Sequence, residues 1–319
     1  MKKIGVLTSG GDAPGMNAAI RAVVRSGLSQ GAEIYGIFDG FQGLVENNIR
    51  KLERSDVSGM IIKGGTLLGS ARLDEFKLVE VRQKAVDNLN ALGIEGLVVI
   101  GGDGTYRGAR ELSAMGINCI AVPGTIDNDI ASTSYTIGFD TALNTIIENV
   151  DKLRDTSASH HRCSVVEVMG NRCGDLALYA GLTVGAEIVI TKETGFDESE
   201  VLQRLREIDA RKQKRHSIVL ISEKITDVEL LAQKISNNTA FSGRSTVLGH
   251  IQRGGSPTAR DRILGTRYGD TALNALINGE TNVCVCLVGD EFITMDITEA
   301  LAVTKQSRKD LFELHRRLV

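Results

Sequence analysis

The segment Gly96-Leu97-Val98-Val99-Ile100-Gly101-Gly102-Asp103-Gly104 decides the fold, because a short apolar run ends abruptly in glycines and one carboxylate. Such a run predicts a buried strand, and the glycines predict a tight turn directly after it. After one helix-length interval comes a second apolar run, residues 119–122, which leads into Pro123-Gly124-Thr125-Ile126-Asp127-Asn128-Asp129. A strand, a helix and a strand in this order predict neighbouring parallel strands.

The same alternation continues along the chain. Apolar runs predict strands at 4–8, 33–38, 97–100, 119–122, 164–168, 217–222 and 246–248. Helical spacing of apolar residues predicts helices around 16–24, 86–92, 106–115 and 143–153. For a chain of 319 residues we therefore predict an α/β protein of two Rossmann-like three-layer α/β/α domains. We expect mostly parallel sheets, with the active site in the cleft between the domains.

Composition narrows the class of protein. Hydrophobic residues make up 42% and charged residues 24%, as in ordinary globular proteins, and the net charge of -3 argues against a nucleic-acid partner. No apolar run approaches the roughly 20 residues that a membrane span needs. The five cysteines form no Cys-x-x-Cys pair, which predicts reduced thiols. We expect a cytoplasmic protein without a membrane partner.

Glycine-rich turns follow several of the predicted strands, at 9–15, 101–104, 169–170 and 249–255. Glycines let phosphate oxygens approach backbone amides, although glycine also closes turns for steric reasons alone. The sequence contains neither the P-loop pattern nor the Gly-x-Gly-x-x-Gly dinucleotide pattern. These turns therefore favour a phosphate site of another kind.

Carboxylates and arginines accompany these turns. Asp103 can hold Mg²⁺ directly or through water, or can form a structural Asx turn. Asp127 and Asp129 are two residues apart, so an extended segment would point both to one side and offer a base beside the cation. The alternative is a surface turn rich in Asn and Asp. Arginines beside glycine turns, such as Arg72 and Arg253, suit phosphate oxygens, although single surface arginines are common.

These motifs together resemble those of the prokaryotic-type ATP-dependent 6-phosphofructokinases. The resemblance rests on residues 7–17, 101–104, 123–129 and 249–257, and it covers nearly the whole chain. It implies transfer of the ATP γ-phosphoryl group to the 1-hydroxyl of fructose 6-phosphate in glycolysis, giving fructose 1,6-bisphosphate and ADP, with Mg²⁺. We expect an ATP-binding domain of residues 1–138 with 252–302, and a fructose 6-phosphate-binding domain of 139–251 with 303–319.

The resemblance also implies the residues of the active site. Asp127 resembles the general base and Asp103 the Mg²⁺ ligand, and the catalytic set is Asp127, Thr125, Asp129 and Arg72. The implied ATP-binding residues are Gly11, Phe41, Arg72, Leu73, Gly102, Asp103, Gly104, Thr105 and Gly108. The implied residues for fructose 6-phosphate are Thr125, Ile126, Asp127, Arg162, Met169, Gly170, Asn171, Glu223, Arg244, His250, Ile251, Gln252 and Arg253.

A second basic set resembles an allosteric effector site at which ADP activates and phosphoenolpyruvate inhibits. It comprises Arg21, Arg25, Arg54, Arg154, Gly185, Glu187, Lys212, Lys214, Arg215 and His216. The residues alone leave open whether these are separate exposed charges. In the family, the arginines corresponding to Arg162 and Arg244 reach into a neighbouring subunit's site, which implies a homotetramer.

Two small residues bear on the phosphoryl donor. Pyrophosphate-dependent relatives carry Asp at the position of Gly104 and Lys at that of Gly124, so the two glycines favour ATP. The sequence departs from the family at Asn171, where an arginine is usual, and at Gly59, where an acidic residue is usual. Two alternatives stay open: a lipid or NAD kinase, which would share the Gly-Gly-Asp-Gly-Thr motif, and a catalytically weak nucleotide-sensing paralogue.

Overall fold

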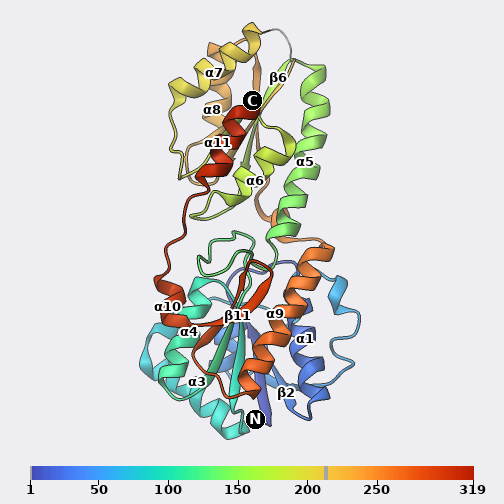
Figure 1. Ribbon diagram of the computed structural model, residues 1–319, viewed down its shortest axis with the longest axis vertical. Coiled ribbons are helices and arrows are strands. Elements are labelled where there is room, and N and C mark those ends of the chain that lie inside the picture. The colour runs from blue at the N-terminus through green and yellow to red at the C-terminus, as the bar shows by residue number, and fades with distance from the viewer. Residues whose placement is uncertain (1, 212–214) are drawn as a thin grey trace. The chain divides into compact units, whose positions relative to one another are not determined.

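The computed structural model describes residues 2–211 and 215–319 and divides them into two compact units (Figure 1). The first unit comprises residues up to 126, 130–141 and 253–305. The second comprises 127–129, 142–252 and 306–319. The chain therefore passes from one unit to the other inside the motif that begins at Pro123.

The first unit is built on a seven-stranded sheet in the order β11-β10-β5-β4-β1-β2-β3. Its inner strands β1, β2, β4, β5 and β10 are parallel, whereas the edge strands β3 and β11 run antiparallel to their neighbours. Their bounds are β1 (Lys3–Thr8), β2 (Glu33–Ile37), β3 (Ile49–Leu52), β4 (Gly96–Gly101), β5 (Asn118–Pro123), β10 (Val283–Val288) and β11 (Glu291–Asp296). Every residue of β4 is buried, as expected for a parallel strand covered on both faces.

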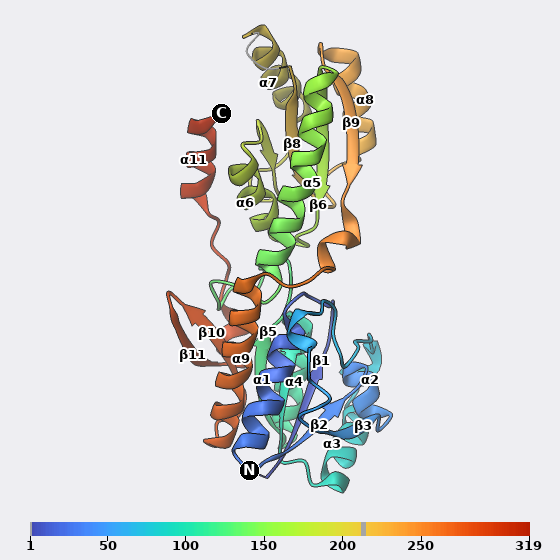
Figure 2. The same ribbon diagram turned by 90° about the vertical axis from the view of Figure 1, so that its right-hand side faces the viewer.

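Helices cover both faces of this sheet (Figures 1 and 2). One face carries α1 (Met16–Ser29) and α9 (Ala259–Ile277), which pack on each other because Gly265 and Gly269 let their backbones approach. The other face carries α2 (Gly40–Val45), α3 (Val79–Leu92), α4 (Asp103–Ala114) and α10 (Ile297–Ala302), whose apolar side chains join one core cluster with those of the sheet. Short 3-10 helices span Met60–Ile62 and Asp74–Lys77.

The second unit has a four-stranded, wholly parallel sheet in the order β7-β8-β6-β9. The strands are β6 (Arg162–Val168), β7 (Ile188–Ile190), β8 (Ser217–Ser222) and β9 (Ser242–Val247). The apolar faces of α7 (Glu198–Ala210) and α8 (Val228–Asn238) form a core cluster with one face of the sheet. Figure 2 shows α5 (Phe139–Ser159) and α6 (Asp175–Val184) on the opposite side, with α11 (Lys309–Leu318) beyond α6. A 3-10 helix spans Gly249–Arg253.

The predicted fold class is confirmed: both units are α/β, and their sheets are mostly parallel. The strand predicted at 246–248 is wrong in its bounds, since β9 spans Ser242–Val247. Its start has no apolar run, and a glycine there packs against the backbone of α8: a Cβ on Gly243 would lie 2.1 Å from the carbonyl oxygen of Ala232. No helix in the described part of the chain is both long and apolar enough to cross a membrane.

Candidate functional site

The first unit contains a cavity of about 390 Å³ between the turn after β1 and the loop that precedes Asp74. Its lining consists of Gly10, Gly11, Asp12, Thr66, Ser70, Ala71, Arg72 and Arg253. Arg72 and Arg253 approach from segments far apart in the sequence, and the buried Nε of Arg253 has no hydrogen-bond partner among the described residues. A cavity with two guanidinium groups beside a glycine turn is chemically suited to phosphate oxygens.

Gly11 is required for this arrangement. A Cβ on Gly11 would lie 2.3 Å from Nη1 of Arg253 and 3.0 Å from its Cζ, closer than real contacts allow. The loop on the other side of the cavity is tied to β1, since the Thr8 hydroxyl donates to the carbonyl oxygen of Gly69 at 2.7 Å. The sequence analysis predicted Gly11 and Arg72 for ATP and Arg253 for the sugar phosphate, and the structure brings all three to one cavity.

The Gly-Gly-Asp-Gly motif forms the amino end of α4, where unpaired backbone N–H groups favour anions. Asp103 is the exposed first residue of this helix, and the space around Gly104 is open, with no atom within 4 Å of a Cβ placed there. The Thr105 hydroxyl donates to the carbonyl oxygen of Ser9 at 3.2 Å and so links this turn to the turn after β1.

The donor set around Asp103 suits Mg²⁺ bound together with a nucleotide. In the described part of the chain there is no group of three or more His, Cys, Asp or Glu side chains that could hold a metal by themselves. Mg²⁺ usually keeps several waters and is held by one or two carboxylates plus substrate phosphates. A single exposed carboxylate beside an anion-binding helix end fits that kind of binding.

Phe41 is buried in the core of the first unit, and it does not merely line a surface site. Its side chain is 6% exposed and stacks on Phe76, with ring centroids 4.3 Å apart. A Cβ on Gly108 would lie 2.5 Å from the Phe41 ring, so this glycine admits the aromatic side chain. Leu73 packs partly buried against the same core cluster.

The residues from Thr125 to Asp129 cross from one unit to the other. In the first unit, Thr125 N–H donates to the carbonyl oxygen of Ile137 at 3.1 Å. Asp127 is buried, with 9% of its surface exposed. The expectation of an extended segment is wrong at Asn128, which has φ of 51°. The physical reason is a local anchor: the Asn128 amide donates to the Asp175 carboxylate at 2.8 Å in the interior of the second unit.

Sugar-phosphate candidates gather past the carboxyl ends of β6 and β8 in the second unit. Met169 N–H donates to Oε1 of the fully buried Gln252 at 3.2 Å. Asn171 N–H donates to Oε1 of Glu223 at 2.8 Å. Burial, together with the negative charges of Glu223 and Asp227, raises the pKa of Glu167. This end of the sheet is therefore acidic, and the neighbouring His250 and Ile251 are exposed.

Arg162 lies at the opposite end of the same sheet, and Arg244 lies in the amino-terminal half of β9. Arg162 is the first residue of β6 and pairs with Ser242, whereas Arg244 pairs with Ser164. At about 3.3 Å per residue, Arg162 and Met169 are separated by about 23 Å along the strand. Within one chain, the structure does not bring these arginines to the candidates at the carboxyl ends.

The predicted effector residues form two groups, one in each unit. In the first unit, Arg21 and Arg25 lie one helical turn apart on α1, and Arg54 follows β3. Burial and the positive charges of Arg25 and Arg54 lower the pKa of Arg21, which shows that the three cations are near one another. Such a cluster favours binding of an anion.

The second group surrounds the end of α6. The Arg154 guanidinium contacts Nε2 of His216 at 3.2 Å and donates to the carbonyl oxygen of Val184. Gly185 ends the helix with φ of 59°, and the buried Glu187 accepts a hydrogen bond from Ile218 N–H at 2.7 Å. Arg215 is exposed, and Lys212 and Lys214 lie outside the described residues.

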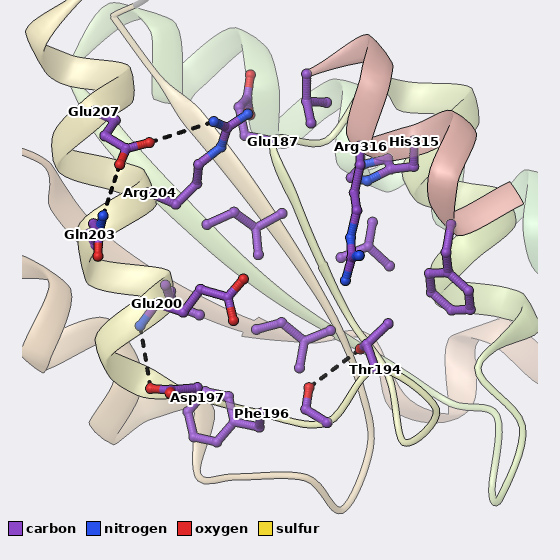
Figure 3. A pocket seen from close by; sticks show the side chains of 17 residues that line it. Glu187, Thr194, Phe196, Asp197, Glu200, Gln203, Arg204, Glu207, His315 and Arg316 are labelled. Atoms are coloured by element: carbon purple, nitrogen blue, oxygen red, sulfur yellow. Dashed lines mark hydrogen bonds and ion pairs between the residues drawn. The ribbon is translucent and has the colours of Figure 1, made fainter. Parts of the chain in front are cut away.

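Glu187 also borders a cavity of about 460 Å³ between β7, α7 and α11 (Figure 3). Arg204 and Glu207, 3.7 Å apart, come from α7, and His315 and Arg316 come from α11. His315 Nε2 bonds the carbonyl oxygen of Ala186 at 2.7 Å, which ties α11 to the segment that carries Glu187. The sequence analysis did not predict this contact, because no motif marks His315.

An anion cavity and a glycine-rich helix start at the carboxyl ends of parallel strands are features suited to an enzyme that transfers phosphoryl groups. The family model described as phosphofructokinase matches residues 3–276. The ATP-dependent 6-phosphofructokinase of Photobacterium profundum is 55% identical over 319 residues, covering 100% of this chain and 99% of the relative. That of Vibrio vulnificus is 53% identical with the same coverage.

Solved structures of phosphofructokinases are also similar to this chain. The phosphofructokinase from Saccharomyces cerevisiae superposes with a TM-score of 0.89 at 34% identity, covering 99% of this chain and 50% of that one. A pyrophosphate-dependent phosphofructokinase from Marinobacter aquaeolei has a TM-score of 0.86 at 19% identity, which shows the shared fold. The chain belongs to the phosphofructokinase family, and the resemblance to its prokaryotic ATP-dependent members is confirmed.

Proposed function

We propose that this protein transfers the γ-phosphoryl group of ATP to the 1-hydroxyl of fructose 6-phosphate in glycolysis, in the cytoplasm. The observation that carries the proposal is the cavity where Gly11, Arg72 and Arg253 meet. Backbone amides and two guanidinium groups there offer the donors that a transferring phosphoryl group needs as its charge redistributes. The acceptor is activated separately, because phosphoryl transfer also requires removal of the hydroxyl proton.

Asp127 is the proposed base for that proton. Its side chain is buried, and the next residue, Asn128, is anchored to Asp175 within the second unit. Asp103 would hold Mg²⁺ together with the nucleotide phosphates, and the cation would offset their negative charge. Arg72 and Arg253 bind phosphoryl oxygens, and Thr125 and Asp129 flank the transferring group.

The glycines at the donor site support ATP over pyrophosphate. A Cβ on Gly104 would meet no protein atom within 4 Å, so space beside this residue is available to a nucleotide. A Cβ on Gly124 would lie 2.8 Å from Cε of Met16 and 3.1 Å from Cγ2 of Ile100, so a lysine there would require those residues to move. Gly104 therefore leaves room for the larger donor, whereas Gly124 is small because Met16 and Ile100 pack against it.

The residues at the carboxyl ends of β6 and β8 are proposed to bind the sugar. Glu223 would accept hydrogen bonds from sugar hydroxyls, while Met169 and Gly170 supply backbone beside it. His250 and Arg253 would bind the 6-phosphate. Because Arg162 begins β6 and Arg244 lies in the amino-terminal half of β9, we propose that a second copy of the chain supplies them to each site in a homotetramer.

The effector proposal rests on the two cationic groups. The cluster of Arg21, Arg25 and Arg54 suits the phosphates of ADP or the anion phosphoenolpyruvate, and the Nε of Arg25 is buried with no partner among the described residues. Arg154, Gly185 and Glu187 form the second group, where Glu187 would contact the Mg²⁺ of a nucleoside diphosphate. We propose that ADP activates and phosphoenolpyruvate inhibits by shifting the population of states.

The test is a coupled assay with purified protein and fructose 6-phosphate. We expect turnover with MgATP and none with pyrophosphate, and a change in the fructose 6-phosphate dependence when ADP or phosphoenolpyruvate is added. Absence of turnover with MgATP, or robust turnover with pyrophosphate, would contradict the proposed reaction. A response to neither effector would remove the regulatory proposal alone.

A further inference from the structure

Asn171 lies in a tight turn directly after β6. Cys173 N–H donates to the carbonyl oxygen of Gly170 at 2.8 Å and closes the turn around Asn171 and Arg172. Asn171 has φ of 53°, a conformation that asparagine tolerates better than most other residues. Gly170 cannot be replaced easily, since its φ is 142° and a Cβ would lie 2.4 Å from the carbonyl oxygen of Cys173. The backbone of this turn is thus closely defined.

From this position Asn171 contacts two carboxylates on different segments. Its backbone N–H donates to Oε1 of Glu223 at 2.8 Å, and its side-chain amide donates to Oδ2 of Asp129 at 3.3 Å. All three residues belong to the second unit. A neutral amide can hold a carboxylate by hydrogen bonding without offsetting the negative charge of that carboxylate. An arginine at the same place would offset the charge.

The turn and the start of α6 each anchor the segment from Asp127 to Asp129 at one further point. The Asn128 amide donates to Oδ2 of Asp175 at 2.8 Å, and the Cys173 thiol donates to the carbonyl oxygen of Asn128 at 3.8 Å. These anchors fix the centre of the segment. The contact from Asn171 holds the last residue of the segment, Asp129, whose carboxylate is proposed to flank the phosphoryl group.

We propose that Asn171 is a positioning residue that orients Asp129 through its side chain and Glu223 through its backbone. The proposal rests on the function proposed above, in which Asp129 flanks the transferring group and Glu223 binds sugar hydroxyls. Because the two contacts come from different parts of Asn171, they can be separated by substitution. Loss of the side chain alone should disturb Asp129 and leave Glu223 in place.

Asn171→Gly is the variant that makes this separation. Glycine accepts the positive φ and keeps the backbone N–H to Glu223, but lacks the amide that holds Asp129. For loss of a partly exposed hydrogen bond to a charged group we expect kcat to fall about tenfold, with KM for fructose 6-phosphate changed less than about twofold. The matched control is Asn47→Gly, since Asn47 is an exposed asparagine with φ of 60° far along the chain from the proposed site. It should leave both constants unchanged.

A double-mutant cycle with Asp129→Ala, which removes the acceptor, tests the contact without relying on activity. Urea unfolding of the wild-type protein, both single variants and the double variant should reveal a coupling between Asn171 and Asp129. Additive effects on unfolding would overturn the contact. An unchanged kcat in Asn171→Gly, or a rise in KM as large as the fall in kcat, would overturn the positioning role. If wild-type protein fails to phosphorylate fructose 6-phosphate, the proposed function fails, while the unfolding cycle still decides the contact.

Discussion

Replacing Gly11 by alanine tests whether Arg253 belongs to the phosphate cavity. The new methyl group would lie 2.3 Å from Nη1, 3.0 Å from Cζ and 3.2 Å from Nη2 of Arg253. Gly11 does not have a positive φ, so alanine causes no backbone strain there. The flexible end of the arginine will therefore move, and the guanidinium will leave its place beside the turn.

The size of the effect follows from the lost contact. A hydrogen bond to a charged group contributes about 1.5–3 kcal/mol, which corresponds to a roughly 10- to 150-fold loss in kcat/KM. Thermal unfolding should change little, because the displaced group is the end of a half-buried side chain at a cavity rather than part of the core. We therefore expect a large kinetic effect and a small effect on stability.

The assay is steady-state kinetics with both substrates varied, on wild-type protein, Gly11→Ala, Arg253→Ala and the double variant. If the methyl group acts through Arg253, adding Gly11→Ala to Arg253→Ala will cause little further loss. Fully additive losses would refute this reasoning and show that Gly11 acts through its own contact with the substrate. A wild-type kcat/KM in Gly11→Ala would show that the guanidinium is not needed where the structure places it.

Three further predictions concern single side chains. Asp127→Ser should lower kcat by about 10²- to 10⁴-fold with a smaller change in KM, and an unchanged kcat would exclude Asp127 as the base. Asp261→Asn should lower the free energy of unfolding, measured in urea at pH 8, by about 2–4 kcal/mol. The Asp261 carboxylate accepts hydrogen bonds from Gly138 N–H at 2.9 Å and from Thr141 N–H at 2.8 Å, and an amide would turn a donor toward one of them. An unchanged midpoint of urea unfolding would contradict this. Burial lowers the pKa of His315 below its ordinary value of 6.5. The unfolded chain therefore binds a proton at this histidine more readily than the folded protein, and the protein should lose stability as the pH falls below the pKa of the unfolded histidine. In His315→Gln the fall in Tm between pH 7 and pH 5 should be shallower, and an identical fall would rule out His315 as its source.

Three inner strands of the first unit were predictable because each is a continuous apolar run that ends in a turn, whereas the inner strand β10 was not predicted. β1, β4 and β5 are buried on both faces, so their sequences carry a strong signal without alternation. The edge strand β3, Ile49-Arg50-Lys51-Leu52, has two exposed cations in four residues and gives almost no signal. It forms because it pairs with β2, which is a property of the sheet and not of the segment.

For the site, the sequence identified residues but not which of them meet. Gly11 and Arg253 are more than two hundred positions apart, and only the folded chain shows that one must be small for the other to fit. Phe41 was expected near a nucleotide base, and the structure shows that its ring is mainly a core side chain stacked on Phe76. Packing of this kind depends on the neighbours, which a motif does not reveal.

The segment Asp127-Asn128-Asp129 shows why two interpretations of one motif need not exclude each other. As a turn rich in Asn and Asp, the segment has a structural role. Asn128 adopts the positive φ, and its side-chain amide donates a hydrogen bond to Asp175. Because Asn128 supplies the local anchor, this structural part is compatible with the chemical roles proposed for the two flanking carboxylates. An alanine at position 128 would remove the anchor and strain the backbone together, so it should reduce kcat by disturbing the carboxylates on either side. A substitution of Asp175 should then cause a smaller loss of kcat, since the backbone at position 128 would remain unstrained.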